Sequence, residues 1–170
     1  MSIAAVVLAA GEASRFGTPK QRLLLPEVLE RLEQSPVDDI VVVAGAHTLE
    51  TPARVVTCAG WKRGPGASLS SGLEELGDDV EAAIVVLADG PDLAPEAVER
   101  VIASWRADGG SVVAASYGGE RGHPVLIARD AWGNIPDEGL RELEVRLVPC
   151  DDLGDPGDVN TPADLPPRLR

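Results

Sequence analysis

The stretch that decides the fold is Ile3-Ala4-Ala5-Val6-Val7-Leu8-Ala9-Ala10-Gly11-Glu12-Ala13-Ser14-Arg15-Phe16-Gly17-Thr18-Pro19-Lys20. Residues 3–8 are an unbroken apolar run, and the run passes directly into small residues and glycine. Such a pattern predicts a buried strand that leads into a tight loop. We expect this loop to carry the chemistry of the protein.

The loop has the composition of an anion-binding site. Ala9, Ala10 and Gly11 lack side-chain bulk, so backbone N–H groups can approach a ligand closely there. Arg15 and Lys20 add two cations, which match a triphosphate in charge and in reach. On local pattern alone, an ordinary strand-to-helix connection with two surface cations remains the alternative.

The spacing excludes two common phosphate loops. Gly11 and Gly17 do not fit G-x-G-x-x-G, and no glycine directly precedes Lys20 as in G-x-x-x-x-G-K-[ST]. Neither a standard dinucleotide fingerprint nor a Walker-type ATPase loop is therefore indicated.

Length and charge narrow the class of protein. The 170 residues, 44% of them hydrophobic, suit one domain over residues 1–170 with a substantial core. A net charge of −13 argues against a nucleic acid as partner, because sequence-independent affinity for nucleic acids comes from Lys and Arg. No apolar stretch is long enough to span a membrane, and no basic region precedes the first apolar run. We expect no membrane partner and a cytoplasmic location.

The order of elements predicts the fold class. Helical periodicity at residues 23–32 and 95–105 alternates with short apolar runs typical of strands. The predicted strands are residues 3–8, 40–44, 54–57, 83–87, 111–115, 125–127 and 145–149. This alternation favours an α/β, three-layer α/β/α sandwich with a mainly parallel, Rossmann-like sheet. Cys58 and Cys150 have no neighbours at metal-ligand spacing, so we expect buried thiols.

Two later segments carry candidate ligand groups. Gly66 and Ser68 stand where a helix is expected to start, and a hydroxyl there either binds phosphate or only caps the helix. Ala88 and Asp89 follow the most apolar strand, where open α/β sheets bind ligands. Asp89 is our candidate for the principal Mg²⁺ ligand, although Asp-Gly-Pro is also ordinary turn chemistry.

A histidine lies in a turn-rich stretch further along. Residues 117–124, which end in Gly122-His123-Pro124, precede the apolar residues 125–127, so we expect a hairpin or a loop between strands there. A lone histidine in such a setting is more often structural than catalytic.

These motifs together resemble the MobA-like nucleotidyltransferases. Leu8 to Lys20 follows the family signature L-A-A-G-x-x-x-R-x-G-x-x-K, and its Ala-Ala-Gly is closest to molybdenum cofactor cytidylyltransferases. Similarity continues in order along nearly the whole chain. It covers residues 61–73, the L-x-D-x-P that contains Asp89, the G-H-P at residues 122–124, a D-x-G-x-R at residues 137–141 and a D-[IV]-D-T-P-x-D-L-like segment at residues 158–165.

The resemblance implies a nucleotide-diphospho-sugar transferase type of fold and a set of roles. Catalysis would use Arg15, Lys20 and Asp89, and Mg²⁺ would be held by Asp89 with Asp158 or Asn160. The acceptor would lie at Gly122, His123 and Pro124. Nucleotide binding would use Leu8, Ala9, Ala10, Gly11, Arg15, Lys20, Gly66, Ser68, Ala88 and Asp89.

The implied reaction moves a nucleotidyl group from an NTP, with CTP favoured, to a small phosphorylated acceptor such as molybdopterin cofactor, and a molybdoenzyme would be the client. Four departures from the family pattern affect mainly the acceptor side: a shortened segment between Gln21 and Val28, and the residues Cys58, Gly90 and Asn160. Two alternatives stay open: an NAD(P)H-dependent oxidoreductase similar to nicotine blue oxidoreductase, and a non-catalytic protein that binds a nucleotide or cofactor.

Overall fold

The computed structural model describes residues 2–11, 20–157, 159 and 161–170, with residues 20–22 described by their backbone alone. Three α-helices and seven strands make up its regular structure, joined by short 3₁₀ turns. The helices are α1 (Lys20–Glu33), α2 (Pro65–Glu74) and α3 (Pro95–Asp108). The strands are β1 (Ser2–Ala9), β2 (Asp39–Ala44), β3 (Arg54–Thr57), β4 (Val80–Leu87), β5 (Val112–Tyr117), β6 (Glu120–Ala128) and β7 (Arg146–Pro149).

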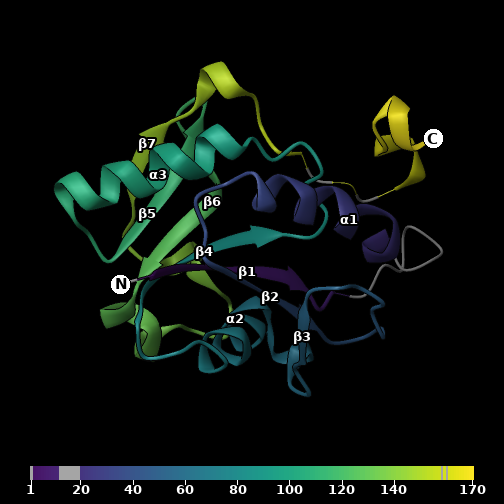
Figure 1. The fold of residues 1–170 in the computed structure, drawn as a ribbon, viewed down its shortest axis with the longest axis horizontal. Coiled ribbons are helices and arrows are strands. Elements are labelled where there is room, and N and C mark those ends of the chain that lie inside the picture. Colours follow the sequence, from purple (N-terminus) through teal and green to yellow (C-terminus); the bar gives the residue numbers. More distant parts are fainter. Residues whose placement is uncertain (1, 12–19, 158, 160) are drawn as a thin grey trace.

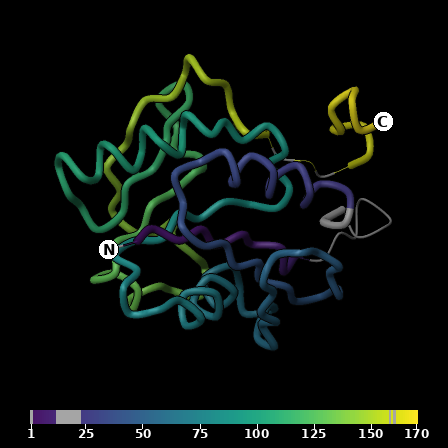
Figure 2. Tube along the Cα trace, viewed as in Figure 1, coloured from purple at the N-terminus to yellow at the C-terminus, as the bar shows by residue number. Residues whose placement is uncertain are grey.

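One seven-stranded sheet runs through the molecule in the order β3-β2-β1-β4-β6-β5-β7. Strands β1, β2, β3 and β4 pair in parallel, as do β5 and β7, whereas β6 runs antiparallel to both of its neighbours. The backbone trace in Figure 2 shows β1 and β4 side by side along the middle of the sheet. The predicted mainly parallel α/β sheet is confirmed.

Helices cover both faces of the sheet and give three layers. Alternate residues of β1 point to opposite faces, so Ile3, Ala5 and Val7 pack against α1 and α3, whereas Ala4 and Val6 pack against α2. Figure 1 shows α1 and α3 on one side of the sheet and α2 on the other. Both faces are buried, which explains why β1 and β4 read as continuous apolar runs in the sequence.

Close packing fixes the position of α2 on the sheet. A Cβ at Gly72 would lie 2.7 Å from Val6 and 2.8 Å from Val43, so only glycine allows the helix to sit this close. Pro65 stands in the first turn, where the missing N–H costs nothing, and Gly64 precedes it at a φ of 135°. The local sequence therefore sets both the start of α2 and its distance from β1 and β2.

The predicted hairpin at residues 117–124 is confirmed, because the chain turns between the antiparallel strands β5 and β6 at Gly118 and Gly119. Gly122, His123 and Pro124 lie past this turn, inside β6. Helix α1 starts at Lys20 and continues through Pro26, which lies on its exposed side. Both thiols are buried and free, as predicted. In the described part of the chain, no helix has the length and apolar character that crossing a bilayer requires.

Candidate active site

A cleft of about 540 Å³ opens at the carboxyl ends of the two central strands β1 and β4. Eleven residues line it, from the end of β1, the end of β4, and the start of α2 with the 3₁₀ turn before it. They are Leu8, Ala10, Gly11, Trp61, Lys62, Gly64, Pro65, Ser68, Leu87, Ala88 and Asp89. Ligands of open α/β sheets bind at this edge.

Strand pairing brings the end of β1, where the Leu8–Lys20 motif begins, next to the L-x-D-x-P motif that contains Asp89. Leu8 of β1 lies opposite Leu87 of β4 in the parallel register, and the Ala88 N–H donates to the Leu8 carbonyl at 3.0 Å. The small residues after β1 and the carboxylate after β4 are therefore fixed on neighbouring walls of one cleft. A spacing of some eighty residues in sequence becomes one site because parallel strands end at the same edge.

Six of the ten predicted nucleotide-binding residues line the cleft, and the others do not or are not described by their side chains. Leu8, Ala10, Gly11, Ser68, Ala88 and Asp89 line the cleft. Ala9 instead points to the opposite face of the sheet and is packed in the core under α1. Arg15 lies outside the described residues, as does the side chain of Lys20, so their predicted roles stay predictions.

Gly66 does not line the cleft itself but lets a neighbouring segment pack against the start of α2. A Cβ at this position would lie only 1.7 Å from the Pro136 carbonyl oxygen, and the Gly66 N–H donates to the Asp137 carbonyl at 2.9 Å. The segment at residues 136–139 thus packs directly on the first turn of α2. Ser68, two residues further along, is 3% exposed and lines the cleft.

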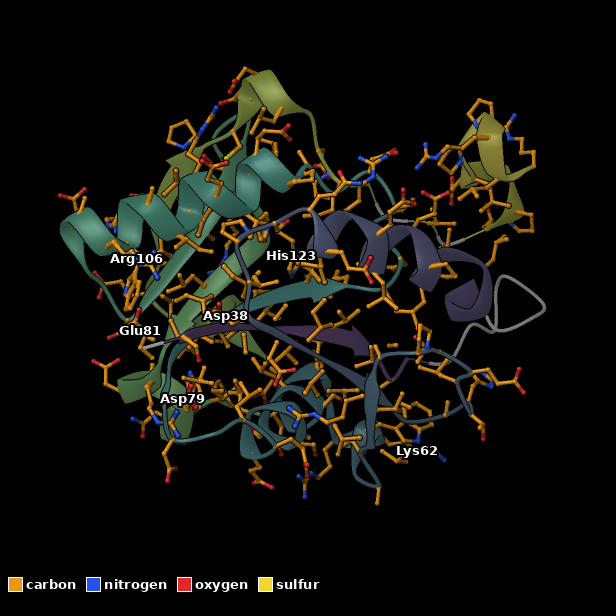
Figure 3. The ribbon with its side chains drawn as sticks, viewed as in Figure 1. Asp38, Lys62, Asp79, Glu81, Arg106 and His123 are labelled. Carbon is orange, nitrogen blue, oxygen red and sulfur yellow. The ribbon has the colours of Figure 1, made fainter. Side chains whose placement is uncertain are left out.

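Trp61 and Lys62 also line the cleft, although neither is among the predicted site residues. Lys62 is the one cation among the described residues that line it, and its Nζ lies 5.6 Å from the centre of the Trp61 ring. Trp61 in turn packs against Gly45, where a Cβ would lie 2.7 Å from the indole. Figure 3 shows Lys62 near the carboxyl end of β3, at the side of the molecule that carries α2. The tryptophan of the second family motif was the signal available in the sequence.

A second pocket, of about 680 Å³, continues from the cleft along the same face of the sheet. Leu8, Pro65 and Leu87 line both hollows, so the two are neighbours. The second pocket also contains Gly122 and His123, the predicted acceptor residues, whereas Pro124 is buried in β6 beside it. Its far wall is the segment at residues 138–141.

Arg121 holds that far wall in place. Its guanidinium donates to the carbonyls of Leu140, Arg141 and Leu143 at 2.9, 3.1 and 3.3 Å. The D-x-G-x-R segment, residues 137–141, is thereby tied to β6. The exposed side chain of Arg141 is left to face the pocket that it lines.

The backbone of His123 is held by the half-buried phenol of Tyr117. The Tyr117 hydroxyl donates to the His123 carbonyl at 2.7 Å. Burial raises the pKa of Tyr117, and the negative charge that Cys150 would carry as a thiolate raises it further. The phenol therefore stays protonated and keeps this hydrogen bond at all pH values near neutrality.

Asp89 is the metal-binding candidate within the described residues. No cluster of three or more His, Cys, Asp or Glu side chains that could hold a metal occurs in the described part of the chain. A divalent cation that keeps several waters can be held by only one or two protein carboxylates. The Val159 N–H donates to the Asp89 carbonyl at 3.1 Å, while the predicted ligands Asp158 and Asn160 lie outside the described residues.

Comparison with known proteins finds a matching family and two curated relatives. The model of the MobA-like NTP transferase domain family matches residues 5–146. A probable molybdenum cofactor guanylyltransferase of Chloroflexus aggregans is 33% identical over 129 residues, which cover 69% of this chain and 60% of that protein. The bifunctional protein GlmU of Streptomyces avermitilis is 36% identical over 126 residues, 64% of this chain and 26% of that protein. The chain thus spans less than two thirds of either curated relative.

Solved structures agree with the fold. The crystal structure of Rv0371c from Mycobacterium tuberculosis H37Rv superposes with a TM-score of 0.78 at 27% identity, with 96% of each chain covered. The site and sheet define an α/β nucleotide-binding fold of the nucleotide-diphospho-sugar transferase type. Within it, this chain belongs to the MobA-like NTP transferase domain family, as its motifs predicted.

Proposed function

We propose that this protein transfers a nucleotidyl group from an NTP to a small phosphorylated acceptor and releases pyrophosphate. The observation that carries the proposal is that two hollows, the cleft beside Asp89 and the second pocket beside His123, adjoin each other. In the first, Ala10 and Gly11 lie on a wall next to Asp89, and the second meets it at Leu8, Pro65 and Leu87. A nucleotide in the first hollow and an acceptor in the second would meet at these shared residues.

The chain's own residues would act by position and charge. Backbone groups of Ala10 and Gly11 would hold the nucleotide, while Arg15, Lys20 and Lys62 would offset charge on the phosphates. An acceptor phosphate oxygen attacks the α-phosphorus in line, the bond from the α-phosphorus to the bridging oxygen breaks, and pyrophosphate carries that electron pair away. No covalent nucleophile from the protein is required.

Mg²⁺ is the proposed cofactor, with Asp89 as its principal ligand and Asp158 or Asn160 as the second. The hydrogen bond from Val159 to the Asp89 backbone supports this pairing, because it anchors the carboxyl-terminal segment beside Asp89. When bound, the ion would neutralise phosphate charge and orient the triphosphate.

CTP is the favoured nucleotide and molybdopterin cofactor the favoured acceptor, with a molybdoenzyme as the client and the cytoplasm as the location. The Ala-Ala-Gly at residues 9–11 supports CTP, whereas the relative from Chloroflexus aggregans is named as a guanylyltransferase. The preference of the protein among the four NTPs is therefore the first property to measure.

The experiment is a thermal-shift panel of CTP, GTP, ATP, UTP and NADPH, each with and without Mg²⁺, because a ligand selective for the folded state raises the unfolding midpoint. We expect the largest shift with CTP and Mg²⁺, and loss of the Mg²⁺-dependent part in Asp89→Ala. Asp108→Asn, an exposed carboxylate at the end of α3, is the matched control.

A turnover assay completes the test. Pyrophosphate release from CTP with molybdopterin as acceptor should fall at least about 10³-fold in Asp89→Ala. An unchanged rate would remove Asp89 from the mechanism. A shift with NADPH alone would favour the oxidoreductase alternative, and binding of CTP without turnover on any phosphorylated acceptor would favour the non-catalytic one.

A further inference from the structure

The connection between β2 and β3 is unusual for parallel strands. Such strands normally need a crossover of a dozen or more residues, usually with a helix that packs on the sheet. Here residues 45–53 make the crossover and contain no helix. Leu49 and Ala53 pack only partly against the core on the α1 side. The place beside α1 where a crossover helix would lie is left open.

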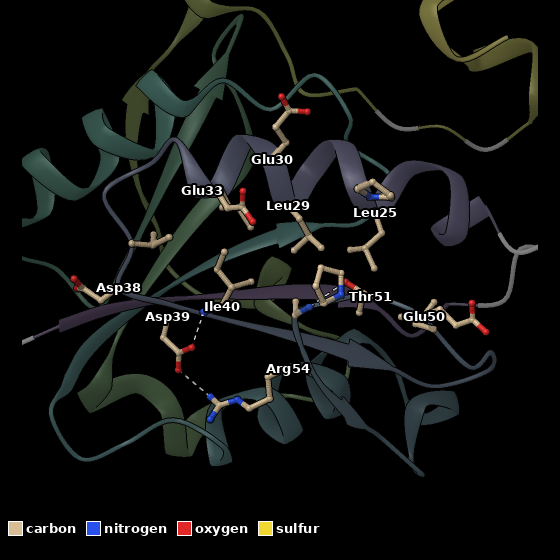
Figure 4. Close-up of a pocket in the computed structure, with 16 residues that line it drawn as sticks. Leu25, Leu29, Glu30, Glu33, Asp38, Asp39, Ile40, Glu50, Thr51 and Arg54 are labelled. Atoms are coloured by element: carbon tan, nitrogen blue, oxygen red, sulfur yellow. Dashed lines mark hydrogen bonds and ion pairs between the residues drawn. The ribbon is translucent and has the colours of Figure 1, made fainter.

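A groove of about 660 Å³ occupies this place, between α1 and the crossover. Its floor is apolar and comes from three elements. Leu25 and Leu29 are one helical turn apart on α1, Ile40 is the second residue of β2, and Leu49 and Ala53 belong to the crossover. Figure 4 shows the side chains of Leu25 and Leu29 directed toward the crossover.

The rim of the groove is acidic. Five exposed carboxylates surround the floor: Glu30, Glu33, Asp38, Asp39 and Glu50. In Figure 4, Glu33 and Asp38 lie toward one end of the groove and Glu50 lies toward the other. An occupant therefore meets negative charge at both ends.

Internal partners neutralise little of this charge. The Asp38 carboxylate accepts from the Ile3 N–H at 2.9 Å, and Asp39 pairs with Arg54 at 3.0 Å. Arg54 is the one cation among the described residues that line the groove. Glu30, Glu33 and Glu50 form no ion pair with any described residue.

We propose that this groove is a docking site for a basic amphipathic helix of a partner protein. A helix that presents a row of leucine-type side chains would fill the floor, as a crossover helix would, with Lys or Arg on its flanks facing the rim. Electrostatic complementarity would speed association and set specificity more than it raises affinity.

Charge decides between this occupant and others. A second copy of this chain also carries a net charge of −13, so two copies would repel each other at this rim. A surface of anionic lipids would be repelled for the same reason. The groove shares no lining residue with the nucleotide cleft, so this inference does not rest on the proposed function.

The test uses the full chain labelled with ¹⁵N and two synthetic helical peptides of fourteen or so residues. Both carry leucines at positions i, i+4, i+7 and i+11. The first has Lys and the second Glu at every flanking position. We expect saturable binding of the Lys peptide, with amide shifts that map to residues 25–33 and 38–54, and binding of the Glu peptide at least about ten-fold weaker.

Two triple variants separate the rim from the overall charge. Glu30→Lys, Glu33→Lys and Glu50→Lys together should weaken binding of the Lys peptide about ten-fold or more. Glu74→Lys, Glu75→Lys and Glu144→Lys together change the net charge equally, at exposed positions outside the groove, and should change binding less than about two-fold.

Three results would overturn the inference. They are equal weakening by both triple variants, amide shifts centred elsewhere on the molecule, and a wild-type dimer in sedimentation that the groove variant alone dissociates. Pyrophosphate release by the groove variant should equal that of the wild type, so the outcome is separable from failure of the proposed function.

Discussion

The backbone N–H of Val159 donates to the backbone carbonyl of Asp89 at 3.1 Å. This bond ties the carboxyl-terminal segment to the backbone of Asp89, two residues after the end of β4. A second bond, from the Asp92 N–H to the Pro156 carbonyl at 3.0 Å, strengthens the contact. Further along, Arg168 pairs with Asp92 at 3.0 Å and with Glu27 of α1 at 3.6 Å. The final segment therefore clamps the loop that begins at Asp89 against α1.

Loosening this clamp should affect metal-dependent binding more than folding. Arg168→Met removes both ion pairs, which are partly exposed and together stabilise the fold by only about 1 kcal/mol or less. We expect a small fall in the free energy of unfolding by urea and a several-fold rise in the Mg²⁺ concentration that gives half-maximal turnover. Arg106→Met, which removes a distant pair with Glu81, is the control. Equal Mg²⁺ dependence in both variants would contradict the clamp.

Lys62 should contribute to nucleotide affinity. Lys62→Met keeps an unbranched side chain against Trp61 and removes the charge, so the KM for the NTP should rise about ten-fold, equivalent to about 1.4 kcal/mol, with kcat within two-fold. Arg63→Met is a matched control, because Arg63 is exposed, lies next in the chain and does not line the cleft. Steady-state kinetics over a range of NTP concentrations measure both effects. A similar rise in both variants would indicate a general effect of charge.

Arg121 should affect binding of the acceptor and not binding of the NTP. Arg121→Met leaves the carbonyls of Leu140, Arg141 and Leu143 without their donor, which should cost about 1–3 kcal/mol of stability and loosen the wall of the second pocket. The KM for the acceptor should rise several-fold, while the thermal shift produced by the NTP stays as in the wild type. Arg121→Lys should not restore the KM, because an ammonium cannot reproduce the guanidinium fork. Full rescue by lysine would contradict this account.

Parts of the site could be predicted from the sequence and parts could not. The meeting of Leu8 and Asp89 followed from buried parallel strands that end at one edge, which periodicity and glycine positions indicate well. The roles of Trp61 and Arg121 depend on which segments pack together in three dimensions, and local patterns do not contain that information. The same limit applies to the hairpin turn, because glycines at 118, 119 and 122 all suit a turn in sequence, whereas the chain turns at Gly118 and Gly119 and leaves Gly122-His123-Pro124 inside β6.

Alkaline pH should destabilise the fold through Cys150. Burial raises the pKa of this thiol, and Arg100 opposes the shift only in part. The unfolded chain, with a thiol pKa of about 8.5, then loses the proton before the folded chain does. Stability from this group is complete below that pH and declines as pH rises toward the higher folded pKa. Urea unfolding at pH 7, 8.5 and 10 should show a steeper decline for the wild type than for Cys150→Ala. Parallel declines would exclude the thiol as the cause.

The approach of residues 136–139 to α2 gives the most direct test of the site's construction. Gly66→Ala would place a methyl group 1.7 Å from the Pro136 carbonyl oxygen, and backbone on both sides leaves no flexible atom to move aside. We expect a loss of about 1–3 kcal/mol in the free energy of unfolding by urea, together with weaker binding of both substrates, because Pro65, the residue before Gly66, lines both hollows. Gly133→Ala is the control, since a Cβ there meets no atom within 4 Å and the backbone needs no positive φ. That variant should unfold within about 0.5 kcal/mol of the wild type. If Gly66→Ala were equally stable and bound NTP as tightly as the wild type, the close packing of this segment on α2 would be wrong.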